Sequence, residues 1–243
     1  MVPLLCPARK NIFFDLDGTL LPMDMDQYLR IYIEGLSVQI PQIPPKDMFN
    51  VLWEGILAMI KNDGAHTNRE VFAQVFTART GIDYYENEDR FLQFYLTDYQ
   101  KGLAACSPTP LAAQIISVLQ KKGYNVVIAT SPLYPAVAAQ SRVNWAGLGD
   151  FTFSMITTFD DFHAAKPNPH YYQELCEKLH VAPEACIMVG NDAEEDGAAR
   201  QVGMDVIMLT DCLINKRNLP LDDFYVATLG DVLLWAEGLP ALV

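Results

Sequence analysis

The stretch "NIFFDLDGTL", Asn11 to Leu20, places two aspartates directly after a run of apolar residues. The run Ile12–Phe14 is typical of a buried strand, and Asp15 and Asp17 follow it with one leucine between them. An unpaired carboxylate in an apolar setting costs several kcal/mol, so a buried strand gains nothing from ending on two acids. We therefore expect Asp15 and Asp17 to meet a cation or to take part in a reaction.

The composition argues against several classes of function. The 243 residues suit one large domain or a core with an insertion, and 51% hydrophobic residues can fill its interior. A formal net charge of −13 disfavours binding to nucleic acid or to an anionic membrane surface, because both need a basic face. No segment approaches the roughly 18 apolar residues of a membrane span. Five scattered cysteines without a C-x-x-C pair, and an N-terminal apolar run too short for a signal peptide, predict a cytoplasmic protein.

Short apolar runs alternate with helical patterns along most of the chain. We expect strands at residues 10–15, 124–130, 151–157 (the weakest), 185–192 and 204–209. We expect helices at residues 110–122, 135–146, 169–179 and 194–202, and a closing helix at 229–239 with Trp235 in the core. Continuous apolar strands that alternate with helices predict an α/β fold, with a Rossmann-like parallel sheet covered on both faces.

Residues 22–107 break this alternation, because they contain no convincing strand. Helical patterns occupy residues 25–36, 46–61, 68–80 and 86–103. Thr67 and Glu70 have the spacing of a capping box before the third of these helices, and Gly81 ends it. The pattern predicts an all-helical domain over residues 22–107, inserted into a core made of residues 1–21 and 108–243.

Polar residues are expected at the carboxyl ends of the strands, which is where open parallel sheets bind their ligands. Acids, hydroxyl groups, an amide and a lysine follow separate strands: Asp15, Asp17, Thr130, Ser131, Lys166, Asn191 and Asp192. Four strands would thus deliver these groups to one edge of the sheet. Their convergence is a stronger sign of a site than any one of them alone.

These residues form four motifs that resemble those of the haloacid dehalogenase-like (HAD) hydrolases. The motifs are "DLDGT", "VVIAT", "KP" and "GNDAEED", and they occur in the family's order over roughly residues 10 to 210. The resemblance implies that the core is catalytic and that the helical insertion is a C1-type cap. It also implies magnesium-dependent hydrolysis of a small phosphate monoester.

The resemblance assigns a role to each motif. Asp15 would attack phosphorus and form an aspartyl-phosphate, and Asp17 would transfer protons. Thr130, Ser131 and Lys166 would hold the phosphoryl oxygens. The metal ligands would be Asp15, Asp17 (through its main-chain carbonyl) and Asp192.

The fourth motif departs from the pattern of many relatives, in which an aspartate directly follows the glycine. Asn191 stands in that place, so either Asn191 or Asp192 could be the metal ligand; we favour Asp192. Asp196 is expected to support the site by holding Lys166 or a metal-bound water. Glu194 and Glu195 are expected to serve only as acids at a helix N-terminus.

Other functions remain open. Asp17 argues against dehalogenases, transport ATPases and phosphonatases, which the resemblance implies have other residues there. A phosphosugar mutase of the same fold is one alternative, and a non-catalytic phospho-acceptor or binding protein is an alternative from another class. The expected partner is a small phosphorylated metabolite, whose identity would depend on the cap and on the loop after "DGT".

Overall fold

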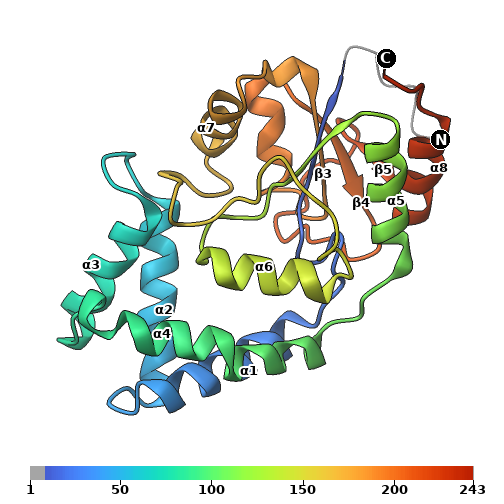
Figure 1. Cartoon of the computed structure of the whole chain (residues 1–243). Coiled ribbons are helices and arrows are strands. Elements are labelled where there is room, and N and C mark those ends of the chain that lie inside the picture. The colour runs from blue at the N-terminus through green and yellow to red at the C-terminus, as the bar shows by residue number, and fades with distance from the viewer. Residues whose placement is uncertain (1–8, 243) are drawn as a thin grey trace.

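The structure is a computed structural model and describes residues 9–242. Residues 1–8 of the predicted core segment, including Cys6, lie outside the described residues. Five parallel strands form one sheet in the order β2-β1-β3-β4-β5. They are β1 (Asn11–Phe14), β2 (Asn125–Ile128), β3 (Cys186–Gly190), β4 (Asp205–Leu209) and β5 (Tyr225–Ala227). The predicted α/β fold with a Rossmann-like parallel sheet is confirmed (Figure 1).

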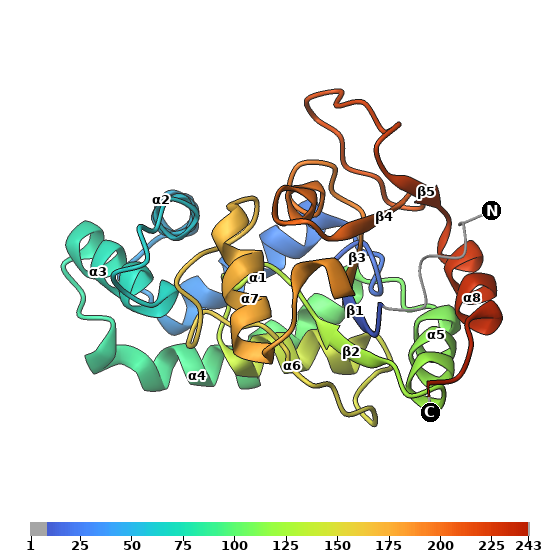
Figure 2. The ribbon, with the colours of Figure 1, turned by 90° about the horizontal axis from the view of Figure 1, so that it is seen from above.

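Both faces of the sheet are buried, because successive side chains of each strand point to opposite sides. In β1, Ile12 and Phe14 belong to one apolar cluster and Phe13 belongs to another. The first cluster includes residues of α5 (Pro110–Lys121) and α8 (Leu229–Gly238), and the second includes residues of α7 (Pro169–Leu179) and η4 (Gly197–Val202). These helices flank the sheet in Figures 1 and 2.

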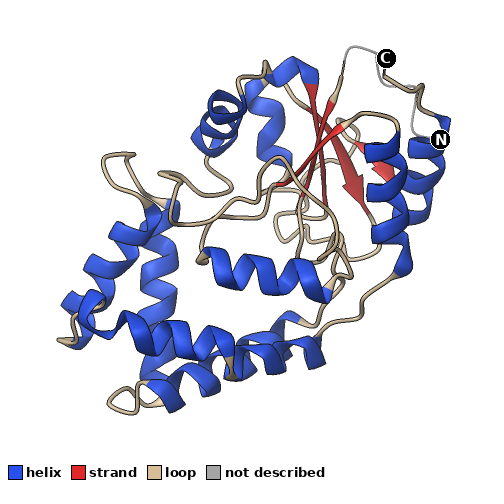
Figure 3. Cartoon of the chain, in the orientation of Figure 1, coloured by secondary structure: helices blue, strands red, loops and turns tan. Residues whose placement is uncertain are grey.

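A group of helices between β1 and α5, which we call the helical unit, lies to one side of the sheet (Figure 3). Its members are α1 (Met25–Gln39), α2 (Pro45–Ile60), α3 (Asn68–Thr80), η1 (Tyr85–Asn87), α4 (Glu88–Leu96) and η2 (Asp98–Ala105). Helix α6 (Ala136–Trp145) follows β2 and packs against α4 and η2. The division into core and cap at residues 21/22 and 107/108 stays a prediction.

Capping confirms one local prediction inside the helical unit. The Thr67 hydroxyl accepts a hydrogen bond from the main-chain N–H of Glu70, and Glu70 Oε2 accepts one from the main-chain N–H of Thr67 at 2.8 Å. Gly81 ends the helix in the left-handed conformation, with φ of 70°, which suits glycine. Within residues 9–242, no helix is both long and apolar enough to cross a membrane.

Two predicted helices are wrong in detail. The helix expected at residues 86–103 breaks at Thr97, whose hydroxyl donates to the carbonyl of Gln93 at 2.6 Å and competes with the helical pattern. The helix expected at residues 194–202 is a 3₁₀ helix that begins only at Gly197. The reason is Asp192, whose Oδ1 accepts from the main-chain N–H groups of Glu194 and Glu195 and folds them into a turn.

Two strand predictions also need correction. The weak strand expected at residues 151–157 runs beside β2, but it contributes only one bridge, between Ile156 and Ile128. Three main-chain hydrogen bonds join it to β2, which are too few for a continuous ladder. Instead β5, a three-residue strand that the sequence pattern did not reveal, completes the sheet beside β4.

Candidate active site

The strand topology brings three of the sequence motifs to one edge of the sheet. Strand β1 lies between β2 and β3, and Phe14 is paired with Ile128 on one side and with Val189 on the other. Asp15 follows β1 directly, and its main-chain N–H donates to the carbonyl of Val189 at 2.9 Å. Thr130 follows β2 at the same edge. The neighbouring carboxyl ends therefore place these side chains close together.

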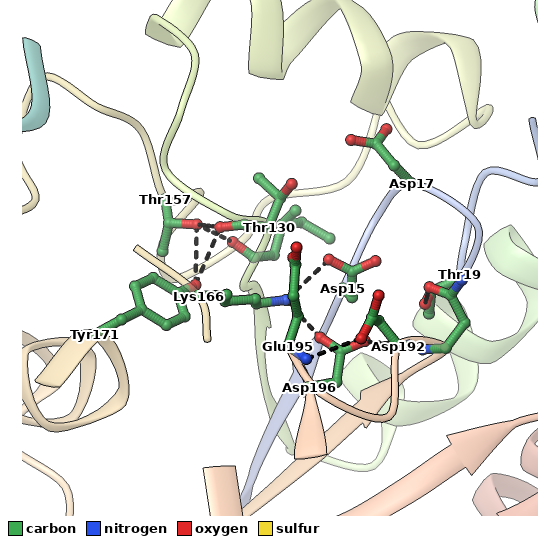
Figure 4. Close-up of polar contacts among 12 residues, drawn as sticks. Asp15, Asp17, Thr19, Thr130, Thr157, Lys166, Tyr171, Asp192, Glu195 and Asp196 are labelled. Atoms are coloured by element: carbon green, nitrogen blue, oxygen red, sulfur yellow. Dashed lines mark hydrogen bonds and ion pairs between the residues drawn. The ribbon is translucent and has the colours of Figure 1, made fainter. Parts of the chain in front are cut away.

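Lys166 joins two carboxylates at this edge (Figure 4). Its Nζ donates to Asp15 Oδ1 at 2.9 Å and to Asp196 Oδ1 at 2.6 Å. All three residues are buried. Burial opposes the charge of Lys166, but the adjacent Asp15 and Asp196 outweigh burial and raise the pKa of Lys166 well above its ordinary value. The lysine is therefore a fixed positive charge beside Asp15.

Asp196 holds the fourth motif in place as well as Lys166. Its Oδ2 accepts from the main-chain N–H groups of Asn191 and Asp192, both at 2.9 Å. A Cβ atom at Gly190 would collide with this carboxylate, which explains the glycine at the end of β3. Burial raises the pKa of Asp196 to about 6, although Lys166 acts in the opposite direction. Asp196 thus lies where the sequence placed a supporting residue.

Asn191 and Asp192 differ in whether a side-chain oxygen atom remains available to bind a metal. Asn191 is buried, its Oδ1 accepts from the Thr19 hydroxyl at 2.9 Å, and its Nδ2 donates to the carbonyl of Cys212 at 2.8 Å. Asp192 uses Oδ1 to accept two main-chain hydrogen bonds, but its Oδ2 has no hydrogen-bond partner in residues 9–242. Of the two, Asp192 is the one with a carboxylate oxygen still available to a metal.

The carboxylate of Asp17 lies apart from that of Asp15 (Figure 4) and contacts a residue that sequence reasoning missed. Arg142, on α6, donates through Nη1 to Asp17 Oδ2. Arg142 is only 1% exposed, and its guanidinium lies 4.3 Å from the centre of the Tyr134 ring. Burial raises the pKa of Asp17, while the charge of Arg142 acts in the opposite direction. The proton donor expected from the sequence is therefore in an ion pair.

This ion pair is incomplete. Asp17 Oδ1 and Arg142 Nη2 are both buried, and neither has a hydrogen-bond partner among the residues that the structure describes. An arginine and a carboxylate often form two parallel hydrogen bonds, so one bond here leaves a donor and an acceptor unused. Unsatisfied buried groups of this kind are costly, and they can instead bond a small polar molecule in the site.

Thr130 and Ser131 form the turn that follows β2. The main-chain carbonyl of Thr130 accepts from the Thr157 hydroxyl at 2.5 Å and from the Tyr171 hydroxyl at 3.1 Å, so its backbone is fixed. The Thr130 side chain is buried. The Ser131 hydroxyl is also buried, and it has no partner within the described part of the chain. The phosphate-binding role of Thr130 and Ser131 stays a prediction.

Glu195 is a member of the site that the sequence did not reveal. The expectation that it serves only at a helix N-terminus is wrong, because the nearest helix begins at Gly197. Its side chain lies beside Lys166 and Asp15 in Figure 4. Burial raises the pKa of Glu195 to about 8, with further increases from the surrounding aspartates and an opposing effect from Lys166. The only available signal was its position in a run of four acids within five residues, Asp192–Asp196.

The oxygen atoms at this edge suit a hard divalent cation. In residues 9–242, no three His, Cys, Asp or Glu side chains are grouped to hold a metal ion. Three other oxygen atoms remain available as metal ligands: Asp15 Oδ2, Asp192 Oδ2 and the main-chain carbonyl oxygen of Asp17. None of them accepts a hydrogen bond from any described residue. Oxygen-only ligands, with water completing the shell, are typical of Mg²⁺. These three oxygen atoms therefore fit the predicted ligand set, in which Asp17 would contribute its main-chain carbonyl.

Comparisons with known proteins identify relatives of this chain and structures of similar fold. The family model "haloacid dehalogenase-like hydrolase" matches residues 9–203. The phosphoglycolate phosphatase of Pasteurella multocida is 26% identical over 208 residues, which cover 83% of this chain and 85% of that protein. The fold is similar to the HAD phosphatase of Thermococcus onnurineus (TM-score 0.57, 22% identity, 96% and 100% of the two chains). It is also similar to the magnesium-bound HAD-hydrolase YfnB of Bacillus subtilis (TM-score 0.57, 19% identity, 92% and 96%). The chain belongs to the haloacid dehalogenase-like hydrolases.

Proposed function

We propose that the protein is a magnesium-dependent phosphatase that hydrolyses a small phosphate monoester through an aspartyl-phosphate on Asp15. The observation that carries this proposal is the contact between Asp15 and the buried Lys166, 2.9 Å apart, at the carboxyl edge of the sheet. A phosphate dianion is repelled by a carboxylate, so a nucleophilic aspartate needs fixed positive charge next to it. Lys166 provides this charge, and a related phosphatase of Pasteurella multocida acts on phosphoglycolate, a small phosphate ester.

The phosphoryl group would be held from several sides. The hydroxyl groups of Thr130 and Ser131 and the ammonium group of Lys166 would bind its non-bridging oxygens. Bound Mg²⁺ would neutralise charge and hold the phosphoryl group in line, with Asp15, Asp192 and the main-chain carbonyl of Asp17 as its protein ligands. Asp196 and Asn191 would support these groups through the hydrogen bonds described above.

Proton transfer is the task of the Asp17 carboxylate. In this role the protonated Asp17 gives its proton to the leaving oxygen as Asp15 forms its bond to phosphorus. The carboxylate then takes a proton from the water that hydrolyses the aspartyl-phosphate. Because Arg142 pairs with Asp17, this task requires the carboxylate to turn away from Arg142. Burial raises the pKa of Asp17, which is the direction of change that suits a proton donor.

Release of inorganic phosphate from p-nitrophenyl phosphate tests the proposal. The wild-type protein should hydrolyse the ester with Mg²⁺, and an excess of EDTA should abolish the activity until Mg²⁺ is restored. The Asp15→Asn variant should be inactive at every Mg²⁺ concentration, whereas Asp150→Asn, an exposed aspartate outside the site, should match the wild type. Equal rates in Mg²⁺ and in EDTA would refute the metal role. A cytoplasmic location stays a prediction.

A further inference from the structure

An apolar cavity of about 170 Å³ lies between the helical unit and the loop that follows β2. Side chains from α1, α2, α3 and α4 form most of its wall. Leu133 and Tyr134 close it from the loop, together with Phe159. Among the described residues that line the cavity, all are apolar or aromatic and none is charged.

Two of the four tyrosines that line the cavity are paired with each other through their hydroxyl groups. Tyr32 and Tyr95 both line the cavity, and their hydroxyl oxygens are 2.7 Å apart, so each satisfies the other. Burial raises the pKa values of both hydroxyls well above the ordinary value, so both stay neutral. The cavity therefore offers mainly contact to carbon atoms, and no charged side chain of the described residues lines it.

The cavity is linked to the active site through its Tyr134 wall. Leu133 and Tyr134 follow Thr130 by three and four residues. The Tyr134 ring also contacts Arg142, whose guanidinium lies 4.3 Å from the ring centre, and Arg142 pairs with Asp17. Asp17 is the group that would protonate the leaving oxygen. The part of the substrate attached to that oxygen would thus lie on the Asp17 side of the phosphate, toward the cavity.

Given the phosphatase activity proposed above, we propose that this cavity binds the organic part of the substrate and that the substrate is an apolar ester. The volume suits one aromatic ring or a short alkyl chain, since an engineered cavity of about 150 Å³ holds benzene. A leaving group with its own carboxylate would enter a space without a charged partner, which costs several kcal/mol. Arg142, which contacts the Tyr134 ring, is already paired with Asp17.

A series of alkyl phosphates tests this inference in the wild-type protein with Mg²⁺. Burying one methylene is worth about 0.8 kcal/mol, so kcat/KM should rise roughly fourfold per carbon from methyl to hexyl phosphate, until the cavity is full. Phenyl phosphate should be a good substrate, and phosphoglycolate a poor one. The Leu52→Trp variant fills the cavity from α2, and it should lower kcat/KM for hexyl phosphate at least tenfold more than for methyl phosphate. The matched control is Leu92→Trp, at an exposed position on α4, which should leave the series unchanged.

The two proposals fail in different ways. Metal-dependent hydrolysis with a flat or falling series, or with phosphoglycolate preferred, would overturn the cavity proposal and leave the phosphatase intact. If no ester were hydrolysed, the phosphatase proposal would fail, and titration of the wild-type protein with 1-hexanol, followed by NMR, would still decide the cavity. Saturable binding lost in Leu52→Trp and kept in Leu92→Trp would support it; no saturable binding would overturn it. Ile56→Phe, also on the α2 wall, serves in both assays if Leu52→Trp does not fold.

Discussion

Lys166 stands between two buried carboxylates, with Nζ 2.9 Å from Asp15 Oδ1 and 2.6 Å from Asp196 Oδ1. This bridge connects the loop before α7 to β1 on one side and to the turn after β3 on the other. Lys166 contacts only one oxygen of each aspartate, so the second oxygen of each remains available for other interactions. Asp196 Oδ2 accepts hydrogen bonds from the main chain of the fourth motif. Asp15 Oδ2, which accepts no hydrogen bond from a described residue, is a candidate metal ligand.

Replacing Lys166 with methionine should damage both stability and activity. The change keeps an unbranched side chain, one atom shorter, but leaves Asp15 and Asp196 buried without a cation. Loss of one partner of a buried ion pair costs about 3–5 kcal/mol. Urea unfolding measures this loss. Lys101→Met is the matched control, since Lys101 pairs with Asp98 at the surface, where such a pair is worth at most about 1 kcal/mol. Equal losses for the two variants would contradict the structural role of Lys166.

Arg142 and Asp17 should depend on one another in a double-mutant cycle. Arg142→Met should destabilise the protein by about 3 kcal/mol at pH 7, because it leaves the Asp17 carboxylate buried and unpaired. In the Arg142→Met background, the additional change Asp17→Asn should recover most of that loss. Urea unfolding of the wild type, both single variants and the double variant gives the coupling. Additive losses would show that the pair contributes nothing.

The Arg142–Asp17 ion pair should also make the free energy of unfolding depend on pH. Burial raises the pKa of Asp17, and the charge of Arg142 is the main influence in the opposite direction, so Arg142→Met should raise this pKa further. The unfolded chain contributes equally to both proteins, so the difference in stability follows the two folded-state pKa values of Asp17, which are both raised. The deficit of Arg142→Met should be largest at neutral pH and should shrink as the pH falls through these folded-state values. Unfolding curves at pH 7 and pH 4 check this, and a deficit that grows toward pH 4 would contradict it.

Asp17→Asn should separate proton transfer from metal binding. Magnesium affinity should stay nearly unchanged, because the main-chain carbonyl survives, while turnover falls roughly 10²–10⁴-fold. The loss should be larger for an alkyl phosphate than for p-nitrophenyl phosphate, whose leaving group needs little protonation. Asp192→Asn should instead weaken Mg²⁺ binding and slow both esters. Magnesium titrations with both substrates measure this, and lost metal affinity with equal slowing in Asp17→Asn would show that its role is misassigned.

The capping box of α3 gives a prediction outside the site. Hydrogen bonds from the main-chain N–H and the hydroxyl of Thr67 lower the pKa of Glu70. Because the folded-state pKa is lowered, the stabilisation is complete above the ordinary pKa of about 4.5 and is lost as the pH falls through the folded-state value. Glu70→Gln should lower the urea midpoint at pH 7, with a smaller difference at pH 3. Glu86→Gln, at an exposed glutamate, should change neither midpoint.

Much of the fold could be predicted, because its strands are continuous apolar runs and its motifs stand at their ends. Asp15 directly follows β1 and Thr130 follows β2, as the patterns indicate. The errors arise where the pattern is short or where a side chain competes with the main chain. Strand β5 has only three residues, and the Thr97 hydroxyl breaks an otherwise helical stretch.

Two residues of the candidate site could not be predicted from the sequence. Arg142 lies 125 residues after Asp17 and belongs to no motif, so only the packing of α6 brings the two together. Its one signal was an arginine among small and apolar residues on a helix that covers the core. Glu195, in contrast, lies inside a recognised motif, but in sequence it resembles an ordinary acid at the N-terminus of a helix. In both cases the tertiary packing around the side chain, which the sequence does not show, brings the residue to the site.

The aspartyl-phosphate on Asp15 is the most direct test of the central claim. The wild-type protein would be mixed with p-nitrophenyl phosphate and Mg²⁺, quenched in acid during turnover, digested, and analysed by mass spectrometry. We expect one phosphoryl group on the peptide that contains Asp15, and none in Asp15→Asn treated in the same way. Turnover without any phosphorylated peptide, or with the phosphoryl group on Ser131 or another residue, would contradict the claim.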